Sequence, residues 1–361
     1  MKFKRRIARA VKASAALLLV ATAVFCLGKR LPDALGSRDT ALTAAAFTLT
    51  DGKVLPQNGS APAPTSAVTS EESTTAPSRA VVADVKPRVR NKSGYYDSNA
   101  DHSNEACYDI VEKTLGADGT AVRGAYVKNC TDLSVDFEER LDAPLTFQVQ
   151  KNADTPQVLI YHTHTGEAYM DEDTDRFYES FYSRTNNNDF NVVAVGNRLT
   201  EALEQRGIKT LHDTTVHDST YDGSYNRSAQ SVIDDMEKYP GIKVVLDIHR
   251  DALGSDECKI KTVFEHNGKK GAQMMILSGC DPENERGFSG WQNNLSFALK
   301  LQTTAEQLYP GMCRPLDFGR FAYNEYLCDG SLLIEIGTDA NSIEEAEYTA
   351  ALLADVLSRV L

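Results

Sequence analysis

Ionisable side chains interrupt three apolar, strand-like segments of the sequence. They are His162, His164 and Glu167 in VLIYHTHTGEAY, Asp247, His249 and Arg250 in VVLDIHRDA, and Glu335 in LLIEIGTDAN. Apolar packing does not call for such groups, because an unpaired charge is costly to bury. Ligands of open α/β sheets bind outside the carboxyl ends of the strands. We therefore expect these side chains to meet at one sheet edge and to form a functional site.

The residue types in this set favour a metal centre. Two His and one Glu are the protein ligands of many catalytic zinc sites, which keep one position open for water. The spacing His164-x-x-Glu167 followed by a distant His249 is the layout of carboxypeptidase-type zinc enzymes. Zinc lowers the pKa of its bound water from about 15.7 to about 7 and so supplies hydroxide at neutral pH. His162 and His164 are two residues apart and share a face of a strand, so both stay open as ligands.

The other polar residues of the set have expected supporting roles. Glu335 would take a proton from the water and return it to a leaving amine. Asp247 would orient the His249 imidazole, and Arg250 would hold a substrate carboxylate or stabilise an oxyanion. The competing interpretations are a hydrogen-bonded core role for His249 and a buried ion pair between Glu335 and Arg250. Three such features at successive strand ends favour the metal site over these alternatives.

Other catalytic chemistries lack their sequence signatures. The chain contains no G-x-S-x-G nucleophile motif, no Walker loop, no G-x-G-x-x-G after a strand and no H-E-x-x-H. No C-x-x-C pair occurs among the cysteines at 107, 130, 258, 280, 313 and 328. These cysteines could form up to three disulfides, with Cys107–Cys130 as the first candidate, or stay as buried or free thiols.

From Pro156 the sequence alternates between strand-like and helix-like segments. The predicted strands cover 157–162, 208–212, 244–249 and 332–337, and the predicted helices cover 192–203, 228–239, 293–309 and 343–361. Residues 261–266 and 273–277 flank Asn267-Gly268 and predict a hairpin. This alternation predicts an α/β domain at 156–361, with a mostly parallel twisted sheet and helices on both faces.

The N-terminal part carries the signals of export. Six Lys and Arg residues in the first twelve positions precede an uncharged apolar run at 13–28. This order predicts a single-pass membrane anchor in 1–30 with the remainder outside the cytoplasm, although a cleaved signal peptide has the same layout. The Pro-, Ser- and Thr-rich composition within 31–88 predicts a disordered stalk. We expect 89–150 to form a small β-rich module with a helix near 108–115.

The charge of the whole chain excludes one class of partner. Its 361 residues contain 38 Lys and Arg against 51 Asp and Glu, a formal net charge of −13. A nucleic-acid binder would show a basic footprint, so we expect no nucleic-acid partner. The hydrophobic fraction of 42% is enough for a folded core.

Several motifs of the chain resemble those of the stage II sporulation protein P family. They are IYHTHTGEAY, DIHRDA and LLIEIGTDAN, with YNRS at 225–228 and WQNNLSFALKLQ at 291–302. The resemblance implies a peptidoglycan hydrolase of endospore-forming bacteria, with amidase and endopeptidase activities and a fold similar to zinc N-acetylmuramoyl-L-alanine amidases. It also implies the stage II sporulation proteins D and M as partners. The implied place is the septal space between membranes, where the wall is degraded during engulfment.

The resemblance assigns roles to individual residues. In the zinc amidases, His, Glu and His bind the metal and a later Glu is catalytic. By motif, His164 matches the first His, His249 the second and Glu335 the catalytic Glu. The amidase Glu ligand comes just before the first helix, where this chain has three Asn and Asp189 instead. Glu167 is the expected replacement, with Asp189 as the alternative.

These observations predict a membrane-tethered, zinc-dependent hydrolase that cleaves the amide between muramic acid and the stem peptide, and peptide cross-links as well. Two alternatives stay open. A carboxypeptidase-like zinc peptidase acting on stem peptides would need a cationic pocket, for which Arg250 is the only strand-end candidate. A non-catalytic wall-binding scaffold would have no need for the set of His164, Glu167, His249 and Glu335.

Overall fold

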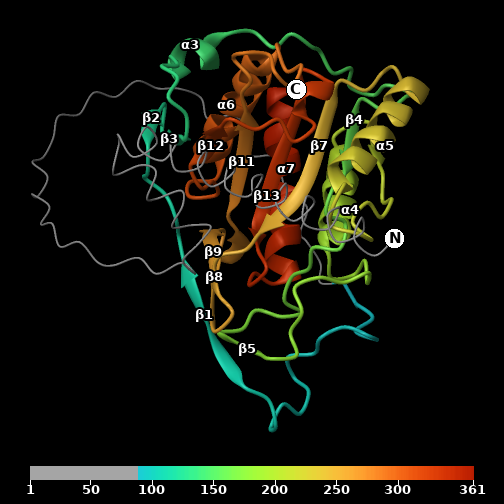
Figure 1. The fold of residues 1–361 in the computed structure, drawn as a ribbon, viewed down its shortest axis with the longest axis vertical. Helices are drawn as coiled ribbons and strands as arrows, with labels where there is room; N and C mark the ends of the chain where they lie inside the picture. The colour runs from blue at the N-terminus through green and yellow to red at the C-terminus, as the bar shows by residue number, and fades with distance from the viewer. Residues whose placement is uncertain (1–87) are drawn as a thin grey trace, which may run out of the picture. The chain divides into compact units, whose positions relative to one another are not determined.

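The computed structural model describes residues 88–361, which form two β-sheets and the helices around them (Figure 1). The 8-stranded sheet has the order β2 (Thr120–Val122), β3 (Ala125–Asn129), β12 (Leu316–Gly319), β11 (Met274–Gly279), β13 (Ser331–Thr338), β7 (Val244–Asp251), β4 (Val158–Tyr161) and β6 (Thr210–His212). The 5-stranded sheet has the order β10 (Lys269–Ala272), β9 (Cys258–His266), β1 (Cys107–Lys113) and β5 (Arg176–Tyr178), with β8 (Gly254–Ser255) paired to β9. The helices are α3 (Phe137–Asp142), α4 (Val192–Glu204), α5 (Ser224–Lys238), α6 (Trp291–Leu308), α7 (Ile343–Val360) and the 3-10 helix η1 (Glu325–Leu327).

The larger sheet combines parallel and antiparallel pairings. Strands β13, β7, β4 and β6 form one parallel group, and β11, β12 and β3 form another. The two groups meet where β11 pairs antiparallel with β13. The chain between β7 and β11 folds as strands of the smaller sheet, without the helical crossover that would return a parallel strand. The α/β class is thus confirmed, whereas the expected mostly parallel sheet is corrected to mixed sheets.

Helices cover both faces of the larger sheet, as the sequence predicts. On β4, Val158 and Ile160 pack into the main core with residues of α4, α6 and α7. Leu159 and Tyr161 face the other side, where they pack with Val232 of α5. Successive residues of a strand point to opposite faces, so a strand buried on both sides is an uninterrupted apolar run. The VLIY sequence of β4 therefore belongs to an interior strand.

The predicted Asn267-Gly268 turn is confirmed, but the second strand of the hairpin is β10, whereas the predicted residues 273–277 lie mostly in β11 of the larger sheet. β9 and β10 pair antiparallel with His266 opposite Lys269, so Asn267 and Gly268 form the connecting turn. Both turn residues have positive φ, 53° and 70°. A two-residue type I′ turn requires this conformation, and Asn-Gly adopts it at low cost.

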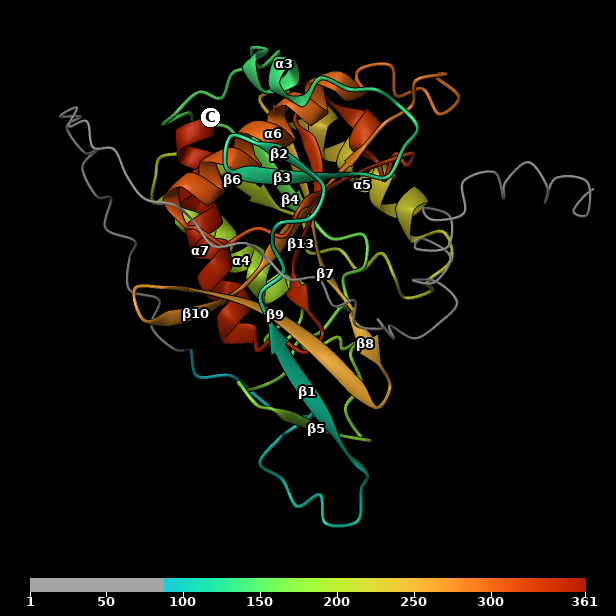
Figure 2. The ribbon, with the colours of Figure 1, turned by 90° about the vertical axis from the view of Figure 1, so that its left-hand side faces the viewer.

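Residues 89–150 contribute strands to both sheets (Figure 2). The helix expected near 108–115 is wrong, because Cys107–Lys113 is strand β1. β1 pairs with β9 on one side and β5 on the other, and this pairing with distant segments overrides the local pattern. β3 joins the larger sheet beside β12. The domain boundaries that we expect from the sequence stay a prediction.

The expectation on localisation is corrected, and of the two open alternatives for the cysteines the structure shows free thiols. The expected single-pass cell-membrane localisation is contradicted, because none of the helices within 88–361 is long and apolar enough to cross a membrane. The anchor expected at 1–30 and nearly all of the stalk expected at 31–88 lie outside the described residues. Cys107 and Cys130 are both free, as are the other four cysteines of the described part. The candidate pair does not form, since Cys107 lies in the smaller sheet and Cys130 follows a strand of the larger one.

Candidate active site

Neighbouring parallel strands bring the predicted residues to one edge of the larger sheet. β7 lies between β4 and β13 and is parallel to both, with its carboxyl end pointing downward in Figure 1. Glu335 of β13 is the direct register partner of His249 of β7, and Tyr161 at the end of β4 is the partner of Asp247. His164 follows in the turn after Tyr161. The three segments that carry the predicted site residues therefore meet at this edge of the sheet, as the sequence predicts.

The two histidines after β4 point in different directions. In the buried His162, Nδ1 lies 2.8 Å from the Ile248 carbonyl and Nε2 lies 2.9 Å from Nε2 of His212. Burial and the neighbouring His212 lower the pKa of His162 to about 3, so the ring stays neutral. The His164 ring stands nearly perpendicular to that of His249, with 5.3 Å between centroids, and its buried Nδ1 has no hydrogen-bond partner. The chain turns directly after β4, so the strand alternation that would put both histidines on one face ends there.

His249 lies between two buried carboxylates. Its Nδ1 is 3.3 Å from Glu167 Oε2, and its Nε2 is 2.9 Å from Asp247 Oδ1. Neither contact has hydrogen-bond geometry, so both are electrostatic, and the buried Nε2 has no hydrogen-bond partner. Burial alone would lower the pKa of His249, but the charges of Asp247 and Glu167 raise it well above its ordinary value. Burial would raise the pKa of both carboxylates, but the imidazolium overrides this effect and lowers the pKa of each.

Asp247 also holds the turn that carries His164. It accepts hydrogen bonds from the backbone N–H of Thr163 at 2.9 Å and from the Thr163 hydroxyl at 2.7 Å. The Thr163 hydroxyl contacts Ser228 Oγ at 2.7 Å, and Ser228 Oγ accepts a hydrogen bond from Asn324 Nδ2 at 3.0 Å. A buried chain of polar groups thus links the loop before β13 and helix α5 to the turn after β4. Sequence reasoning missed Thr163 and Asn324, whereas Ser228 is part of the YNRS motif.

Arg250 is buried and faces the backbone around Glu167. Its Nε donates to the Ala168 carbonyl at 3.1 Å, and its guanidinium also donates to the Ser183 carbonyl. Its own backbone N–H donates to Glu167 Oε2 at 3.2 Å. Arg250 therefore joins the Glu167 loop to the segment around Ser183, and its direct role toward substrate stays a prediction.

Glu335 has the perturbed ionisation of a proton-transfer group. Its Oε2 is buried without a hydrogen-bond partner. Burial and the negative charges of Asp251 and Glu167 raise the pKa of Glu335 to about 8, against the opposing charges of His249 and Arg250. A carboxyl group with a pKa in this range can both accept and donate a proton near neutral pH.

The structure brings Glu167, and not Asp189, to the histidines. Glu167 is 8% exposed and contacts His249. Asp189 is exposed, and its carboxylate accepts a hydrogen bond from the backbone N–H of Asn91 at 3.0 Å. The ligand roles of the two carboxylates stay predictions, and the geometry favours Glu167.

An aromatic wall, which sequence reasoning missed, covers His164. The Tyr221 ring stacks on the His164 ring with 4.7 Å between centroids and 7° between planes, although Tyr221 is 65% exposed. Tyr225 meets the same imidazole edge-on at 5.6 Å. The Arg184 guanidinium lies 5.9 Å from the centre of the Tyr221 ring and pairs with Asp218. Tyr221 lies in the loop before α5, and Tyr225 begins the YNRS motif, to whose tyrosine sequence reasoning assigns no role.

The buried unpartnered atoms of the site fit a divalent cation. They are His164 Nδ1, His249 Nε2 and Glu335 Oε2. Such atoms carry a desolvation cost, which a bond to a metal ion would offset. Imidazole and carboxylate donors are those that zinc prefers. His164 and His249 therefore offer unpartnered donors to a zinc ion, and Glu167, the third predicted ligand, lies 3.3 Å from His249 Nδ1, whereas Glu335 is the expected proton-transfer group.

A tighter acidic group lies elsewhere in the described part of the chain. The potential ligand atoms of Asp97, Asp171 and Glu172 lie within 4.8 Å of one another, a limit that the predicted zinc ligands do not meet. Lys92 Nζ is 3.0 Å from Asp97, 2.7 Å from Asp171 and 2.9 Å from Glu172. The Lys92 ammonium therefore already contacts all three carboxylates and offsets one of their negative charges.

Solved structures that are similar to part of the chain include three amidases. The N-acetylmuramoyl-L-alanine amidase AmiC2 of Nostoc punctiforme is 12% identical, with 57% of this chain and 94% of that chain covered and a TM-score of 0.32. The CwlD amidase from Clostridioides difficile, in complex with the GerS lipoprotein, is 14% identical over 56% of this chain and 94% of that chain, with a TM-score of 0.32. The N-acetylmuramyl-L-alanine amidase Ami1 from Mycobacterium smegmatis is 14% identical over 58% of this chain and 96% of that chain, again with a TM-score of 0.32.

Sequence comparison points to one family. The stage II sporulation protein P of Bacillus subtilis (strain 168) is 29% identical to the chain over 232 residues. This match covers 58% of the chain and 52% of the relative, so the chain spans about half the length of the relative that it matches. The family model described as stage II sporulation protein P matches residues 53–358, which is most of the chain, and confirms the resemblance. The chain belongs to the stage II sporulation protein P family.

Proposed function

We propose that the chain is a zinc-dependent peptidoglycan hydrolase that cleaves the amide between muramic acid and the L-alanine of the stem peptide. The observation that carries this proposal is the meeting of His164, Glu167 and His249 with Glu335 at one sheet edge. Membership of the stage II sporulation protein P family supports a role in wall degradation during sporulation.

His164, Glu167 and His249 would hold the zinc ion. When bound, zinc supplies a water of lowered pKa and polarises the carbonyl of the scissile amide. Ligation requires His249 to lose the proton that Glu167 and Asp247 stabilise, so metal affinity should rise with pH. Asp247, anchored to Thr163, would keep the His249 imidazole oriented.

Glu335 would move the proton that the reaction requires. Its unpartnered Oε2 would accept a proton from the attacking water and deliver it to the leaving nitrogen, which must be protonated before the C–N bond breaks. Arg250 would hold the Glu167 loop in place through its backbone N–H and its guanidinium.

We extend the proposal to the cross-links between stem peptides, because their amide bonds require the same chemistry. We also propose the stage II sporulation proteins D and M as partners in septal wall degradation during engulfment. Family membership supports both extensions. Neither extension depends on the assignment of a particular ligand.

Digestion of purified cell-wall sacculi by the full chain tests the proposed function. We expect mass spectrometry to detect intact glycan strands and free stem peptides, with cleavage stopped by a chelator and restored by zinc. Release of trimmed stem peptides alone would favour the carboxypeptidase-like alternative. The absence of any released fragment would favour a wall-binding scaffold.

A further inference from the structure

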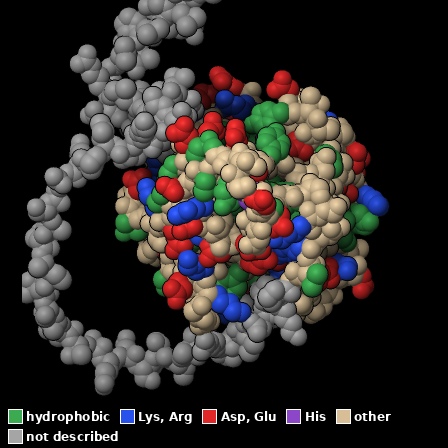
Figure 3. Space-filling view, turned by 90° about the horizontal axis from the view of Figure 1, so that it is seen from below, with side chains coloured by type: hydrophobic (Ala, Val, Ile, Leu, Met, Phe, Trp, Pro, Cys, Tyr) green, Lys and Arg blue, Asp and Glu red, His purple; other side chains and the backbone are tan. Residues whose placement is uncertain are grey.

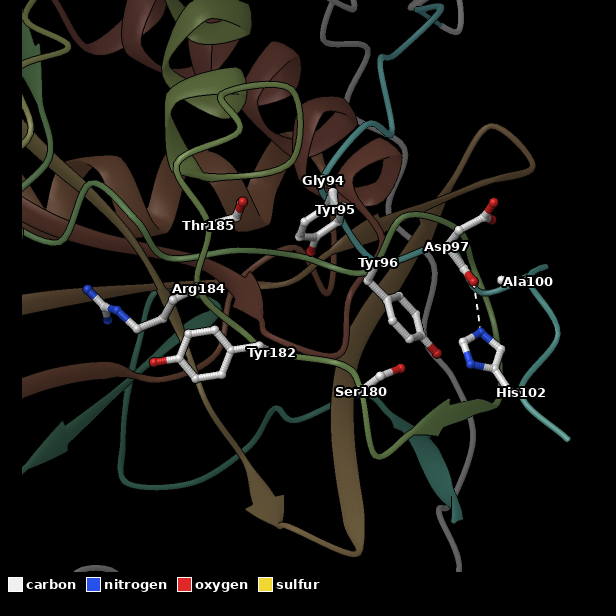
Figure 4. A pocket seen from close by; sticks show the side chains of 10 residues that line it. All are labelled: Gly94, Tyr95, Tyr96, Asp97, Ala100, His102, Ser180, Tyr182, Arg184 and Thr185. Carbon is white, nitrogen blue, oxygen red and sulfur yellow. Dashed lines mark hydrogen bonds between the residues drawn. The ribbon is translucent and has the colours of Figure 1, made fainter. Parts of the chain in front are cut away.

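We propose that a cavity beside the candidate active site is a saccharide subsite that binds an N-acetylated sugar of a glycan strand. The cavity has a volume of about 460 Å³, within the range of roughly 300–1,000 Å³ for ligand clefts. Its wall includes Tyr95, Tyr96, Ser180, Tyr182 and Thr185 (Figure 4). The inference rests on the proposed function and deepens it, because it names the part of the substrate that this region would hold.

Aromatic rings and hydroxyl groups form much of the cavity wall. Tyr95 is fixed by stacking on Phe190 at 4.5 Å, and Tyr96 is fixed by an edge contact with Phe181 at 5.1 Å. Tyr182 is 70% exposed, so most of its ring is open to a ligand. A tyrosine ring has an apolar face and a polar edge, which match the C–H face and the hydroxyl rim of a sugar. The hydroxyls of Tyr95 and Tyr96 are already hydrogen-bonded to the Tyr169 carbonyl and the Tyr178 N–H, so Tyr182 is the ring of the wall that is open to the C–H face of a sugar.

The carboxylate, imidazole and guanidinium groups of the wall are already paired. Asp97 accepts from Lys92 at 3.0 Å, and His102 contacts Glu105 at 2.9 Å. Arg184 pairs with Asp218 of the loop after β6, and Figure 4 shows the Arg184 and Tyr182 side chains extending to the same side, away from Tyr95 and Tyr96. Lys and Arg side chains are also interspersed with Asp and Glu on the face that Figure 3 shows. A stem peptide carries carboxylates that need unpaired cations, so this cavity fits a neutral sugar better.

One segment joins the cavity to the candidate active site. Residues within 180–185 line the cavity, and Arg184 of that segment forms an antiparallel backbone bridge with Glu167. Residues paired across such a bridge lie about 4.5–5.5 Å apart at Cα. The Arg184 guanidinium also lies over Tyr221, whose ring stacks on His164. A sugar in the cavity would therefore bring a muramic acid amide of the same glycan strand close to the candidate ligands.

Calorimetric titration of the full chain with chitotetraose, a peptide-free tetramer of N-acetylglucosamine, tests the inference. Tyr182→Ala should raise the Kd for chitotetraose about two- to tenfold, the range for loss of one aromatic contact. Tyr182 is largely exposed, so its substitution should not impair folding. Tyr126→Ala in β3, on the far side of the larger sheet from β4, is the matched control and should leave the Kd unchanged. A free stem tripeptide should bind Tyr182→Ala as it binds the wild type.

The outcomes that overturn the inference differ from those that overturn the proposed function. An unchanged Kd for chitotetraose in Tyr182→Ala, no binding of chitotetraose to the wild type, or weaker stem-peptide binding in Tyr182→Ala would overturn the saccharide subsite. Glu335→Gln should lose amide cleavage and keep its affinity for chitotetraose. Sugar binding through Tyr182 without cleavage of sacculi would support the subsite and contradict the proposed function. Cleavage with sugar binding that does not depend on Tyr182 would contradict the subsite alone.

Discussion

At the residue scale, the charges around His249 explain why this position suits a metal ion. The imidazolium is flanked by Glu167 and Asp247, so two negative charges face one positive charge in a buried setting. A divalent cation in place of the proton would balance these carboxylates better. His164 adds a buried, unpartnered Nδ1 to the same place. His162 cannot do so, because both of its ring nitrogens already have partners.

Substitution of the three histidines separates ligands from supporting residues. His164→Ala and His249→Ala should lose most of their bound zinc, because each removes one of three protein ligands. His162→Gln should keep its zinc, since its ring nitrogens face away from the site. Elemental mass spectrometry of the dialysed proteins measures the zinc content. Retention of zinc by His164→Ala together with its loss from His162→Gln would show that the assignment is wrong.

Thr163→Val tests the polar chain behind the site. The change keeps the shape of the side chain and removes the hydroxyl that joins Asp247 to Ser228. It should cost about 1–3 kcal/mol in free energy of unfolding, because buried polar groups lose their partner. Zinc affinity should also fall about 10- to 100-fold, since Asp247 contacts a proposed zinc ligand.

The control for this prediction is Thr303→Val in α6. The buried Thr303 hydroxyl donates to helix carbonyls, at 2.8 Å for the shorter bond, and belongs to the main body of α6. This variant should lose some stability in urea unfolding and keep the zinc affinity of the wild type. Competition with a zinc-binding dye provides the second readout. Equal zinc affinity in Thr163→Val and wild type would contradict a positioning role for Thr163.

At the scale of elements, the strands that carry the site could be predicted and several of their neighbours could not. β4, β7 and β13 are apolar runs that end in polar residues, and this local pattern is sufficient. β1 could not be predicted, because its extended form depends on β9 and β5, which are distant in sequence. β11 runs antiparallel to β13 because the chain reaches it through strands of the smaller sheet, and no local sequence pattern predicts this connection. Which of His162 and His164 faces the site depends on the residue at which β4 ends, and the sequence pattern does not give that residue.

Glu325 connects η1 to the end of β11, and its ionisation should make this connection depend on pH. Its carboxyl group is fully buried and accepts a hydrogen bond from the Gly279 N–H at 3.0 Å. Burial raises the pKa of Glu325 well above its ordinary value of 4.5. The stability that Glu325 contributes is therefore complete below about pH 4.5 and is lost as the pH rises toward the folded-state pKa.

Glu325→Gln should remove this loss. The free energy of unfolding of the variant, relative to that of the wild type, should increase as the pH rises. This difference should grow by up to about 1.4 kcal/mol per pH unit until the pH reaches the folded-state pKa of Glu325. Urea unfolding at pH 5 and pH 8 measures the difference. Glu265→Gln, at an exposed position of β9, should follow the wild type at both values. A difference between Glu325→Gln and wild type that stays constant with pH would refute a protonated carboxyl in the fold.

At the scale of the whole molecule, pairings between distant segments unite the described chain. Residues 88–150 supply β1 to the smaller sheet and β2 and β3 to the larger one (Figure 2). The candidate site likewise draws on β7, β13, the turn after β4 and helix α5. The sequence motifs contain the predicted residues of this site. The contacts of Tyr221 and Asn324, in contrast, form only when the distant segments of the chain pack together.

Zinc binding should stabilise the whole fold by mass action, because its proposed ligands come together only in the native state. A free zinc concentration about 100 times the Kd should add about 2.7 kcal/mol to the free energy of unfolding. The Tm should then rise by roughly 5–10 °C in a thermal unfolding scan. His249→Ala should show no such rise. An equal rise in His249→Ala and wild type would place the stabilising zinc elsewhere.

The rate at which Glu335→Gln releases stem peptides from sacculi tests the central claim most directly. Wild type, Glu335→Gln and the control Glu265→Gln are compared after loading with zinc to the same measured content. Loss of a proton-transfer group should slow release at least about 100-fold in Glu335→Gln, while Glu265→Gln keeps the wild-type rate. Release by Glu335→Gln at the wild-type rate would contradict the assignment of the chemistry to this sheet edge.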